Sequence, residues 1–355
     1  MKTQANVKKQ AKQQGNSQAN IGQLARVDAN WRRWIAENLM LGTHPTALVP
    51  ILTQAGIAVT EANSEIEAAL RSPYLQGARR LANRVAKRDW VLAIQSQLNK
   101  LGDASVARRD KLSGDDFLQQ HYRLNRPVII TGMLGHFPAR QLWNLDYFER
   151  HFNERKVEVQ FGRDADAKYE LNSIAHKREL LFGDYVRMVR DSGRSNDFYM
   201  TANNDSRNRE SLRELWNDVG TLPDYLDDDP ARKGFFWFGP AGTVTPFHHD
   251  LTNNFMAQII GRKRIRLIAP SELPRLYNFR HCFTDVDGRD IDLARFPAMA
   301  NVQVLDCVLE PGEILFLPVG WWHFVEALDI SVTLAMTNFR WHNDFYSNYP
   351  SDHDF

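Results

Sequence analysis

The sequence has few cysteines, no long apolar run and no pattern of a secretory signal. Its two cysteines, Cys282 and Cys307, lie far apart and form no CxxC pattern, so we expect neither a disulfide framework nor a cysteine-based zinc site. No apolar run approaches the roughly 18 residues that cross a bilayer. No apolar stretch follows Lys2 as it would in a secretory signal. These absences predict a cytoplasmic protein without a membrane partner.

Charge of one sign is also scarce, with one local exception. The formal net charge is +1 over 355 residues, which gives no global electrostatic reason to expect specific binding of nucleic acid. Residues 1–27 differ, because they contain basic residues but no acidic residue and no aromatic residue. Such a segment cannot bury enough apolar surface to offset the entropy lost on ordering, so we expect a disordered basic tail there.

Residues 28–109 show helical spacing. Glycine and proline divide this region into about four expected helices. Two sets of apolar residues fall on common helix faces: Trp31, Trp34, Ile35 and Leu39, and then Trp90, Ile94 and Leu98. We interpret both sets as packing faces and the region as an α-helical N-terminal part.

From residue 110 onward the pattern becomes that of short strands. Ser113 and Asp116 indicate a capped short helix, which leads into the strand "RPVIITG" ending at Gly132. From residue 235 a series of short runs is separated by glycine and proline: "FFWFG", "NNFMAQIIG", "KRIRLIA", "NVQVLDCVL", "EILFLPV", "HFVEAL" and "ISVTLAMTNFRW". This series predicts an antiparallel sandwich or barrel over 110–355.

Two short motifs could hold a metal ion. In "TPFHHD", residues 245–250, strand alternation directs His248 and Asp250 to one face and His249 to the other. An H-x-D pair alone is a weak signal, because a histidine with a structural role is common. The second motif is "EPGEILFLPVGWWHF", which carries His323, 73 residues after Asp250.

Together the two motifs resemble the paired motifs of cupins, with Asp250 in place of the second histidine of the first motif. Two histidines and one carboxylate form a facial triad that leaves three adjacent coordination positions open. That arrangement suits Fe(II), which has to hold a bidentate cosubstrate and O₂ together, whereas a structural zinc site fills four positions with protein ligands. We therefore expect His248, Asp250 and His323 to be the metal ligands and the catalytic centre.

Residues 110–341 resemble the JmjC subclass of cupins, most closely the asparaginyl hydroxylase that modifies hypoxia-inducible factor. The segments that carry the resemblance are "TVTPFHHD", "NNFMAQIIGRKR", "ARFP", "EPGE" and "WWHFVE". The resemblance implies a double-stranded β-helix (jelly-roll) core and an Fe(II)- and 2-oxoglutarate-dependent dioxygenase that consumes O₂. The expected fold is therefore mainly β, with helical additions and a helical N-terminal region.

The resemblance also implies a basic residue that binds the far carboxylate of 2-oxoglutarate, and Lys263 stands at the matching position. Strand alternation supports this role independently. Phe255, Ala257, Ile259, Ile265 and Leu267 share the parity of Lys263, while the neighbouring arginines take the other parity. A lysine on an otherwise apolar face needs an anion, because an unpaired buried ammonium is unfavourable.

Four further positions match family residues near the cosubstrate. The hydroxyls of Thr245 and Tyr199 are expected to bond the same carboxylate as Lys263, and the amides of Asn254 and Asn338 to lie near the cosubstrate. Each of the four side chains could instead satisfy backbone groups only.

Two positions near the family's substrate pocket depart from the asparaginyl hydroxylase. His249 replaces a tyrosine, and Arg340 replaces a bulky aromatic residue, so asparagine specificity does not follow from the resemblance. The chain also ends soon after Asn338, before the helices through which that enzyme pairs. We expect any homodimer to use another surface, such as the N-terminal helices.

The function that these observations favour is hydroxylation of a protein or peptide side chain, with release of succinate and CO₂. The protein or peptide substrate rests on family analogy alone. Two alternatives stay open: a hydroxylase of a small molecule or free amino acid, and a non-catalytic cupin that only binds metal. Lys263 argues against the second alternative, because a scaffold has no need of a cosubstrate anchor.

Overall fold

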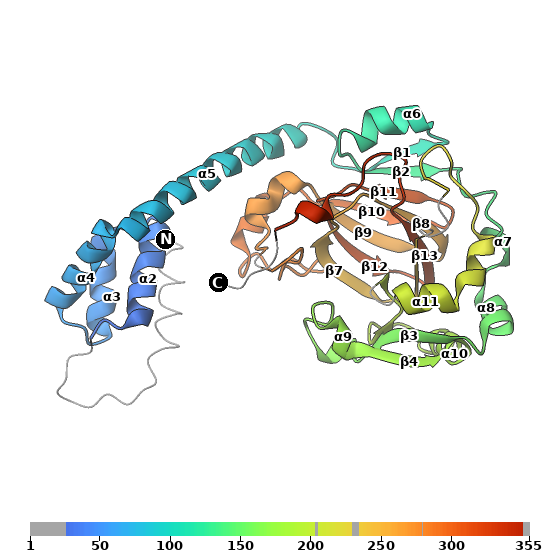
Figure 1. Ribbon diagram of the computed structural model, residues 1–355, viewed down its shortest axis with the longest axis horizontal. Helices are drawn as coiled ribbons and strands as arrows, with labels where there is room; N and C mark the ends of the chain where they lie inside the picture. The colour runs from blue at the N-terminus through green and yellow to red at the C-terminus, as the bar shows by residue number, and fades with distance from the viewer. Residues whose placement is uncertain (1–25, 203–204, 229–233, 279, 351–355) are drawn as a thin grey trace. The chain divides into compact units, whose positions relative to one another are not determined.

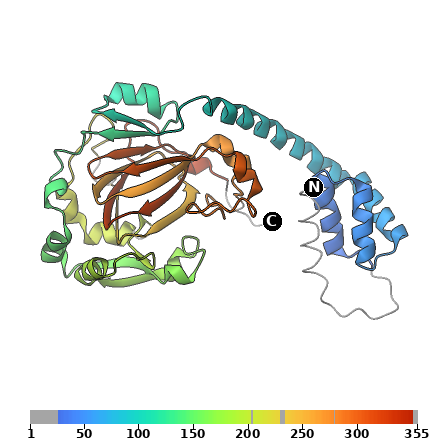
Figure 2. The ribbon, with the colours of Figure 1, turned by 180° about the vertical axis from the view of Figure 1, so that it is seen from behind.

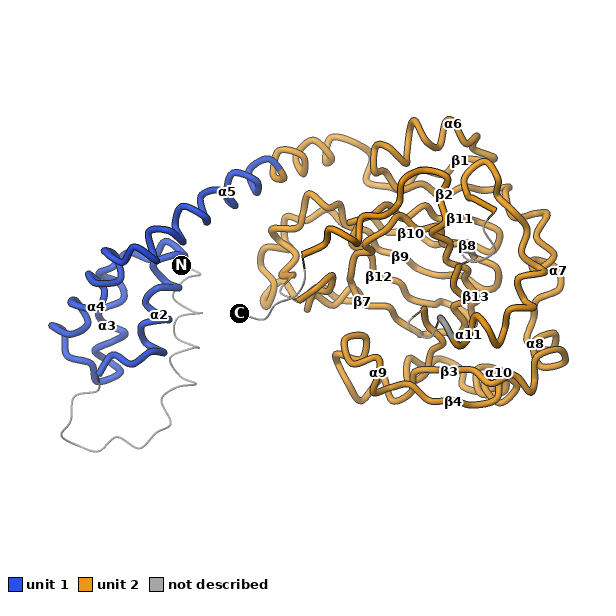
Figure 3. The backbone as a smooth tube through the Cα atoms, in the orientation of Figure 1, with its two compact units in different colours: residues 1–91 blue, residues 92–355 orange. Residues whose placement is uncertain are grey.

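A computed structural model describes residues 26–202, 205–228, 234–278 and 280–350 (Figure 1). The tail expected over 1–27 lies outside these residues except for its last two. The chain divides into two compact units, Met1–Val91 and Leu92–Phe355 (Figure 3). This division falls inside one helix, whereas the sequence suggested that the β domain begins at residue 110. No described helix is long and apolar enough to cross a membrane.

The first unit is built from helices, as expected. They are α2 (Ala29–Met40), α3 (Pro45–Gln54), α4 (Val59–Arg71) and the start of α5 (Pro73–Asn99). Asp28 caps α2 by accepting a hydrogen bond from the backbone N–H of Trp31. The predicted face of α2 packs inward through Trp34, Ile35 and Leu39. Val27 is buried in the same core, so ordered packing already begins within the segment expected to be a tail.

The second predicted helical face does not pack as expected. Trp90, Ile94 and Leu98 of α5 are 67%, 38% and 56% exposed. The opposite side of α5 packs instead, since Ser96 is buried and donates a 2.5 Å hydrogen bond to Glu272. No described residue therefore covers the apolar face of α5.

The core of the second unit is two facing sheets, which confirms the predicted jelly-roll (Figures 1 and 2). The strand orders are β1-β2-β11-β8-β13-β6 and β10-β9-β12-β7. The strands of the larger sheet are β1 (Ala107–Asp110), β2 (Val128–Thr131), β6 (Phe235–Gly239), β8 (Asn254–Ile260), β11 (Ile314–Leu317) and β13 (Ser331–Met336). Those of the smaller sheet are β7 (Val244–His249), β9 (Lys263–Ile268), β10 (Leu305–Leu309) and β12 (Trp322–Ala327).

A third sheet and several helices cover this core. The sheet has the order β4-β3-β5, with β3 (Lys156–Phe161), β4 (Lys177–Leu181) and β5 (Phe198–Tyr199). The helices are α6 (Gly114–Phe117), α7 (Ala139–Leu142), α8 (Leu145–Phe152), α9 (Ser173–His176), α10 (Phe182–Asp191) and α11 (Asp205–Ser211). Shorter helical turns are η1 (Leu118–Tyr122), η2 (Arg163–Ala165), η4 (Arg213–Asp218), η6 (Pro270–Arg275), η7 (Pro297–Asn301) and η8 (Tyr346–Asn348). The expected cap at Ser113 is confirmed, because its side chain accepts from the Asp116 N–H.

The turn between β8 and β9 shows that the predicted parity shared by Phe255, Ala257, Ile259 and Lys263 is wrong. This turn, at Gly261 and Arg262, carries the chain from the larger sheet to the smaller one. Strand parity therefore cannot be counted through this turn. Phe255 packs in the hydrophobic cluster that contains Phe117 and Phe316, and its side chain does not lie beside Lys263. Within β9 the alternation is as predicted: Lys263, Ile265 and Leu267 are buried, and the arginines between them are partly exposed.

Candidate metal centre and cosubstrate pocket

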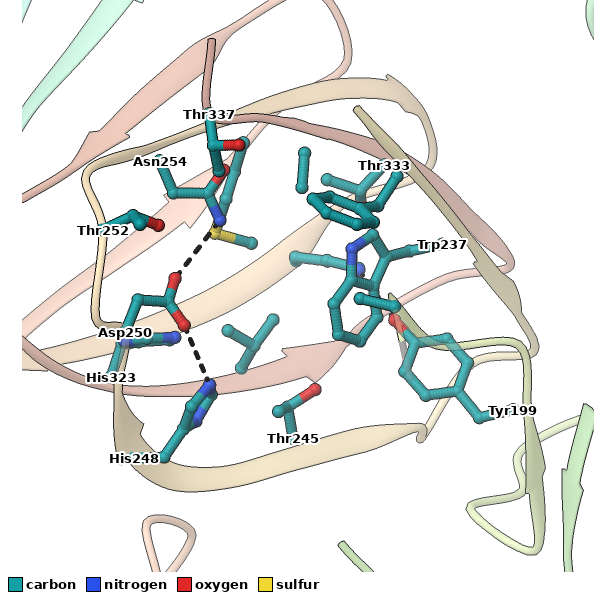
Figure 4. A pocket seen from close by; sticks show the side chains of 16 residues that line it. Tyr199, Trp237, Thr245, His248, Asp250, Thr252, Asn254, His323, Thr333 and Thr337 are labelled. Atoms are coloured by element: carbon teal, nitrogen blue, oxygen red, sulfur yellow. Dashed lines mark hydrogen bonds and ion pairs between the residues drawn. The ribbon is translucent and has the colours of Figure 1, made fainter. Parts of the chain in front are cut away.

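A cavity of about 170 Å³ opens between the two sheets. Its lining combines polar residues from the metal motif with apolar side chains of both sheets (Figure 4). In Figure 4, His248, Asp250 and His323 stand together at one side, and Tyr199 and Trp237 stand at the other. A molecule in this cavity would therefore meet the histidine–aspartate cluster at one end.

The three predicted metal ligands come together as the motifs indicated. His248 lies on β7 directly opposite His323 of β12, and their ring centroids are 4.0 Å apart. Asp250 follows β7, with its Oδ1 3.6 Å from Nε2 of His248. One ligand atom from each of the three residues lies within 4.8 Å of the others. This is a donor set that a single divalent cation could share.

Both imidazoles are oriented by the backbone. Nδ1 of His248 lies 2.9 Å from the carbonyl oxygen of Pro246, and Nδ1 of His323 lies 3.0 Å from that of Trp321. A carbonyl can only accept, so each Nδ1 carries the proton and each Nε2 keeps its lone pair. Outer partners of this kind commonly fix the tautomer of metal-binding histidines. Asn254 adds a 3.3 Å hydrogen bond to Asp250 Oδ2.

The electrostatics of the cluster favour a bound cation. Burial, together with the neighbouring His248, lowers the pKa of His323 to about 3, which keeps that ring neutral. Burial opposes ionisation of Asp250, but the two imidazoles outweigh it and hold the carboxyl pKa well below its usual range. For His248, burial is outweighed by Asp250, which raises the imidazole pKa. An ionised carboxylate and two nitrogen donors in a buried pocket therefore fit Fe(II) or a similar ion.

Lys263 is buried and has no counter-ion among the residues that the structure describes. It is 2% exposed, and its Nζ donates a 3.0 Å hydrogen bond to the hydroxyl of Tyr199. Burial alone accounts for the fall of its pKa to about 7, so no ionised group among the described residues offsets its charge. A buried ammonium in this state favours an incoming anion. The carboxylate of 2-oxoglutarate fits that need.

The structure brings three of the other predicted residues to the cavity. Thr245, Tyr199 and Asn254 line it together with Lys263. Asn338 is buried outside the lining, where its Nδ2 donates a 2.5 Å hydrogen bond to the carbonyl of Asp227. Its amide therefore holds a loop, which is the structural alternative considered for it.

The two predicted substrate residues also lie outside the cavity lining. His249 packs its ring edge-on against Trp322, 4.8 Å between centroids, on the other face of β7. Arg340 is exposed and donates to the carbonyl of Pro223. A substrate role for either remains a prediction that would concern the surface around the cavity rather than its interior.

The apolar wall of the cavity was not predicted from the sequence. This wall is formed by Phe235, Trp237, Met256, Val325 and Ala335. The run "FFWFG" contained the signal, because Phe235 and Trp237 alternate with Phe236 and Phe238 along β6. Both faces of that strand are aromatic, however, and only the fold shows which face lines the cavity.

Comparison with known proteins agrees with this site. Residues 115–348 match the model of a cupin-like domain, so the chain belongs to the cupin-like family. Over 253 residues it is 34% identical to Lysine-specific demethylase JMJ30 of Arabidopsis thaliana, covering 68% of this chain and 56% of that protein. It is 32% identical over 230 residues to Lysine-specific demethylase 8 of Xenopus tropicalis, covering 62% of this chain and 50% of that protein. It is 24% identical over 263 residues to tRNA wybutosine-synthesizing protein 5 of Gallus gallus, and this match covers 70% of this chain and 78% of that protein.

These relatives define a JmjC-type cupin, a class whose enzymes use Fe(II) and 2-oxoglutarate. They support that class and not the asparaginyl hydroxylase in particular, so the closest resemblance suggested by the sequence was too narrow. The chain spans about half the length of the first two curated relatives that it matches.

Proposed function

We propose that this protein is an Fe(II)- and 2-oxoglutarate-dependent dioxygenase that hydroxylates a side chain of a protein or peptide. The observation that carries the proposal is that one cavity contains two histidines and an aspartate that could share a metal ion, and also a buried lysine with no counter-ion among the described residues. His248, Asp250 and His323 would hold the metal. Lys263, Thr245 and Tyr199 would hold the far carboxylate of the cosubstrate, with Asn254 beside it.

The chain contributes position and a dry environment to this chemistry. When bound, iron, 2-oxoglutarate and O₂ supply the oxidising power: one oxygen atom enters a substrate C–H bond, the other enters succinate, and CO₂ is released. The backbone carbonyls behind His248 and His323 hold both rings in the tautomer that exposes Nε2. The aromatic wall around Trp237 limits the water that can reach the reacting atoms.

The cavity favours a neutral target group over a methylated lysine. Asp250 is the one carboxylate among the described residues that line it, and it belongs to the metal triad. A methylated ammonium group beside the metal would need another anion or aromatic rings close around it, whereas Tyr199 and Trp237 stand on the side of the cavity away from the triad (Figure 4). Thr252, Asn254 and Thr337 offer hydroxyl and amide groups instead. Hydroxylation of a neutral side chain therefore fits the lining better than the demethylation that two relatives carry in their names.

Incubation of a peptide pool with the enzyme, Fe(II), 2-oxoglutarate and O₂ tests the proposal. We expect succinate to form in step with peptides that gain one oxygen atom, and the Asp250→Ala enzyme to produce neither. Stimulation by a free amino acid but by no peptide or protein would instead favour the small-molecule alternative. Metal binding without any turnover of 2-oxoglutarate would favour the non-catalytic cupin.

We also propose that two copies of the chain pair through α5. The exposed residues Val91, Ile94 and Leu98 of α5, with Leu101 in the turn just after it, follow the 3-4-3 spacing of a coiled-coil seam. In an antiparallel pair, Val91 of one copy faces Leu101 of the other and Ile94 faces Leu98, so the stripe complements itself. The flanking Gln95 and Gln97 are uncharged, so two copies would not repel each other there.

A further inference from the structure

One buried cation has no role in the function described so far. The side chain of Arg163, in η2, is 0% exposed and forms a 2.9 Å ion pair with Glu170, which is 7% exposed. The Nε and Nη1 atoms of Arg163 have no hydrogen-bond partner in the described part of the chain. A charged pair without full hydrogen bonding is an unfavourable way to fill a core, so its location calls for an explanation.

The guanidinium contacts both elements that carry the anchor hydroxyls. Its Nη2 donates a 2.7 Å hydrogen bond to the carbonyl of Val244, the residue before Thr245 on β7. Its central carbon lies 5.1 Å from the centroid of the Tyr199 ring, within the range of a cation–π contact. Arg163 thus fixes Tyr199 from behind and fixes the strand that presents Thr245.

The hydrogen-bond directions leave Tyr199 ready for an anion. Lys263 donates to the Tyr199 oxygen, so the phenolic proton is free to point elsewhere. Burial raises the pKa of Tyr199, and Arg163 lowers it by a smaller amount, so the hydroxyl stays protonated. Tyr199 can therefore donate to a carboxylate that Lys263 attracts.

Among the described residues Arg163, Glu170, Tyr199 and Lys263, the positive charges outnumber the negative charges by one when Lys263 is protonated. Arg163 and Glu170 cancel each other, Tyr199 is neutral, and a protonated Lys263 leaves one positive charge. A single carboxylate restores the balance in a region without solvent. Arg163 contributes to the positive potential there, because it lies against the same tyrosine ring as Lys263.

We propose that Arg163 is a positioning residue for the far carboxylate of 2-oxoglutarate, acting through the Tyr199 ring and the Val244–Thr245 backbone. This inference rests on the proposed function. The plainer reading is that Arg163 only holds its own loop against β7. That reading predicts little effect on ligand binding, because the Tyr169 hydroxyl also donates to the Val244 carbonyl, at 3.1 Å, and would keep it paired.

Binding of two oxo acids to the Mn(II)-loaded full-length enzyme separates the two readings. Both 2-oxoglutarate and pyruvate offer the 2-oxo acid group to the metal, but pyruvate lacks the far carboxylate. We expect Arg163→Gln to weaken 2-oxoglutarate binding about tenfold or more and pyruvate binding less than about twofold. Arg163→Lys keeps the charge and should recover part of the loss. Arg266→Gln is the matched control, since that arginine donates to the Gly288 carbonyl on the outward face of β9.

A double-mutant cycle then tests the route of the effect. If Arg163 acts through the tyrosine, Arg163→Gln should add little to the loss caused by Tyr199→Phe. Equal weakening of 2-oxoglutarate and pyruvate, or no weakening in a folded variant, would overturn the inference. If Arg163→Gln does not fold, Arg163→Lys takes its place. Its affinity for 2-oxoglutarate should then fall at least about threefold more than its affinity for pyruvate. A wild-type enzyme that binds pyruvate as tightly as 2-oxoglutarate would instead overturn the proposed anchor at Lys263.

Discussion

At the scale of single residues, Lys263 has the largest effect on how this protein is expected to behave. Its burial is unfavourable in the free protein and becomes favourable when a carboxylate arrives. The same residue therefore links ligand binding, protonation and stability. The predicted metal ligands have the opposite charge requirement, since an ionised Asp250 beside two imidazoles favours binding of a cation.

The affinity for 2-oxoglutarate should depend on pH through Lys263. Its pKa in the free protein is about 7, and a bound carboxylate raises that pKa. Below pH 7 the lysine is already protonated, so the affinity should be nearly constant. Above pH 7 binding must take up one proton, and the affinity should fall about tenfold per pH unit until the pKa of the complex is reached. Calorimetry in buffers of different ionisation enthalpy would detect the proton; no uptake at pH 8 would contradict the assignment.

Replacement of Lys263 by a neutral apolar residue should stabilise the protein while removing its cosubstrate. Between pH 7 and the ordinary lysine pKa of 10.5 the unfolded chain binds the extra proton, so the free energy of unfolding of the wild type rises with pH. Lys263→Met should remove that slope and raise the free energy of unfolding at pH 7 by about 2–4 kcal/mol. Urea titrations at pH 7 and pH 9 would measure both effects, with Arg264→Met as the control on the exposed face. A less stable Lys263→Met variant would show that the charge is compensated.

The triad makes a prediction of its own. His323→Ala and Asp250→Ala should each lower the affinity for Fe(II) by more than about tenfold, because each removes one of three protein donors. Anaerobic titration of Fe(II), followed by the absorption band that appears with 2-oxoglutarate, would measure this. His249→Ala, on the opposite face of β7, should keep both iron and the band. Loss of iron in His249→Ala alone would reverse the assignment of the two neighbouring histidines.

At the scale of elements, the sequence predicted strands well wherever alternation stayed within one strand. "FFWFG" and the capped turn at Ser113 form as expected, and β9 buries Lys263 on its apolar face. The contacts of a side chain were not predictable where they depend on residues far away in the sequence. The parity of Phe255 with Lys263 was lost at a turn between sheets, and the bond from Asn338 to the Asp227 carbonyl follows no local pattern, so its role near the cosubstrate stays a prediction. No sequence pattern singled out Arg163, because Tyr199 and Val244 contact it only in the folded chain.

The exposed stripe of α5 makes a prediction for assembly. Leu98→Asp should dissociate the proposed dimer, because it places a charge in the centre of an apolar seam, next to Ile94 of the other copy. Sedimentation velocity over a range of concentrations would measure the change. Ala93→Asp introduces the same charge on α5 outside the stripe and should leave the dimer intact. A wild-type protein that is monomeric at high concentration, or a dimer that tolerates Leu98→Asp, would contradict the proposed pairing.

At the scale of the whole molecule, the two units have separate hydrophobic cores. One contains Leu48 and Leu52 of the helical unit, and the others surround the sheets of the second unit. Separate cores allow separate unfolding transitions. Ligands of the cavity should act on the second unit alone, since every residue that lines the cavity belongs to it.

Scanning calorimetry should therefore show a transition that responds to Mn(II) and 2-oxoglutarate and another that does not. Leu48→Ala should lower the temperature of the transition that does not respond to ligand, because removing a fully buried leucine side chain lowers the free energy of unfolding by about 2–5 kcal/mol. Ligand binding should be unchanged. Leu315→Ala, at a buried site in the larger sheet, is the matched variant and should lower the responsive transition. A single transition that shifts as a whole in all cases would mean that α5 joins the two units into one cooperative structure.

Because no described residue neutralises Lys263, the supply of 2-oxoglutarate should affect how fast the protein is degraded in a cell. If Lys263 binds 2-oxoglutarate as proposed, the protein without this ligand would carry a buried charge that no described residue compensates, so it would open more often and be cleaved by proteases more readily. A ligand at a hundred times its dissociation constant stabilises the folded state by about 2.7 kcal/mol. The half-life of the chain would then lengthen when 2-oxoglutarate is plentiful and shorten when it is scarce. Abundance, and not only catalytic rate, would follow the supply of this metabolite.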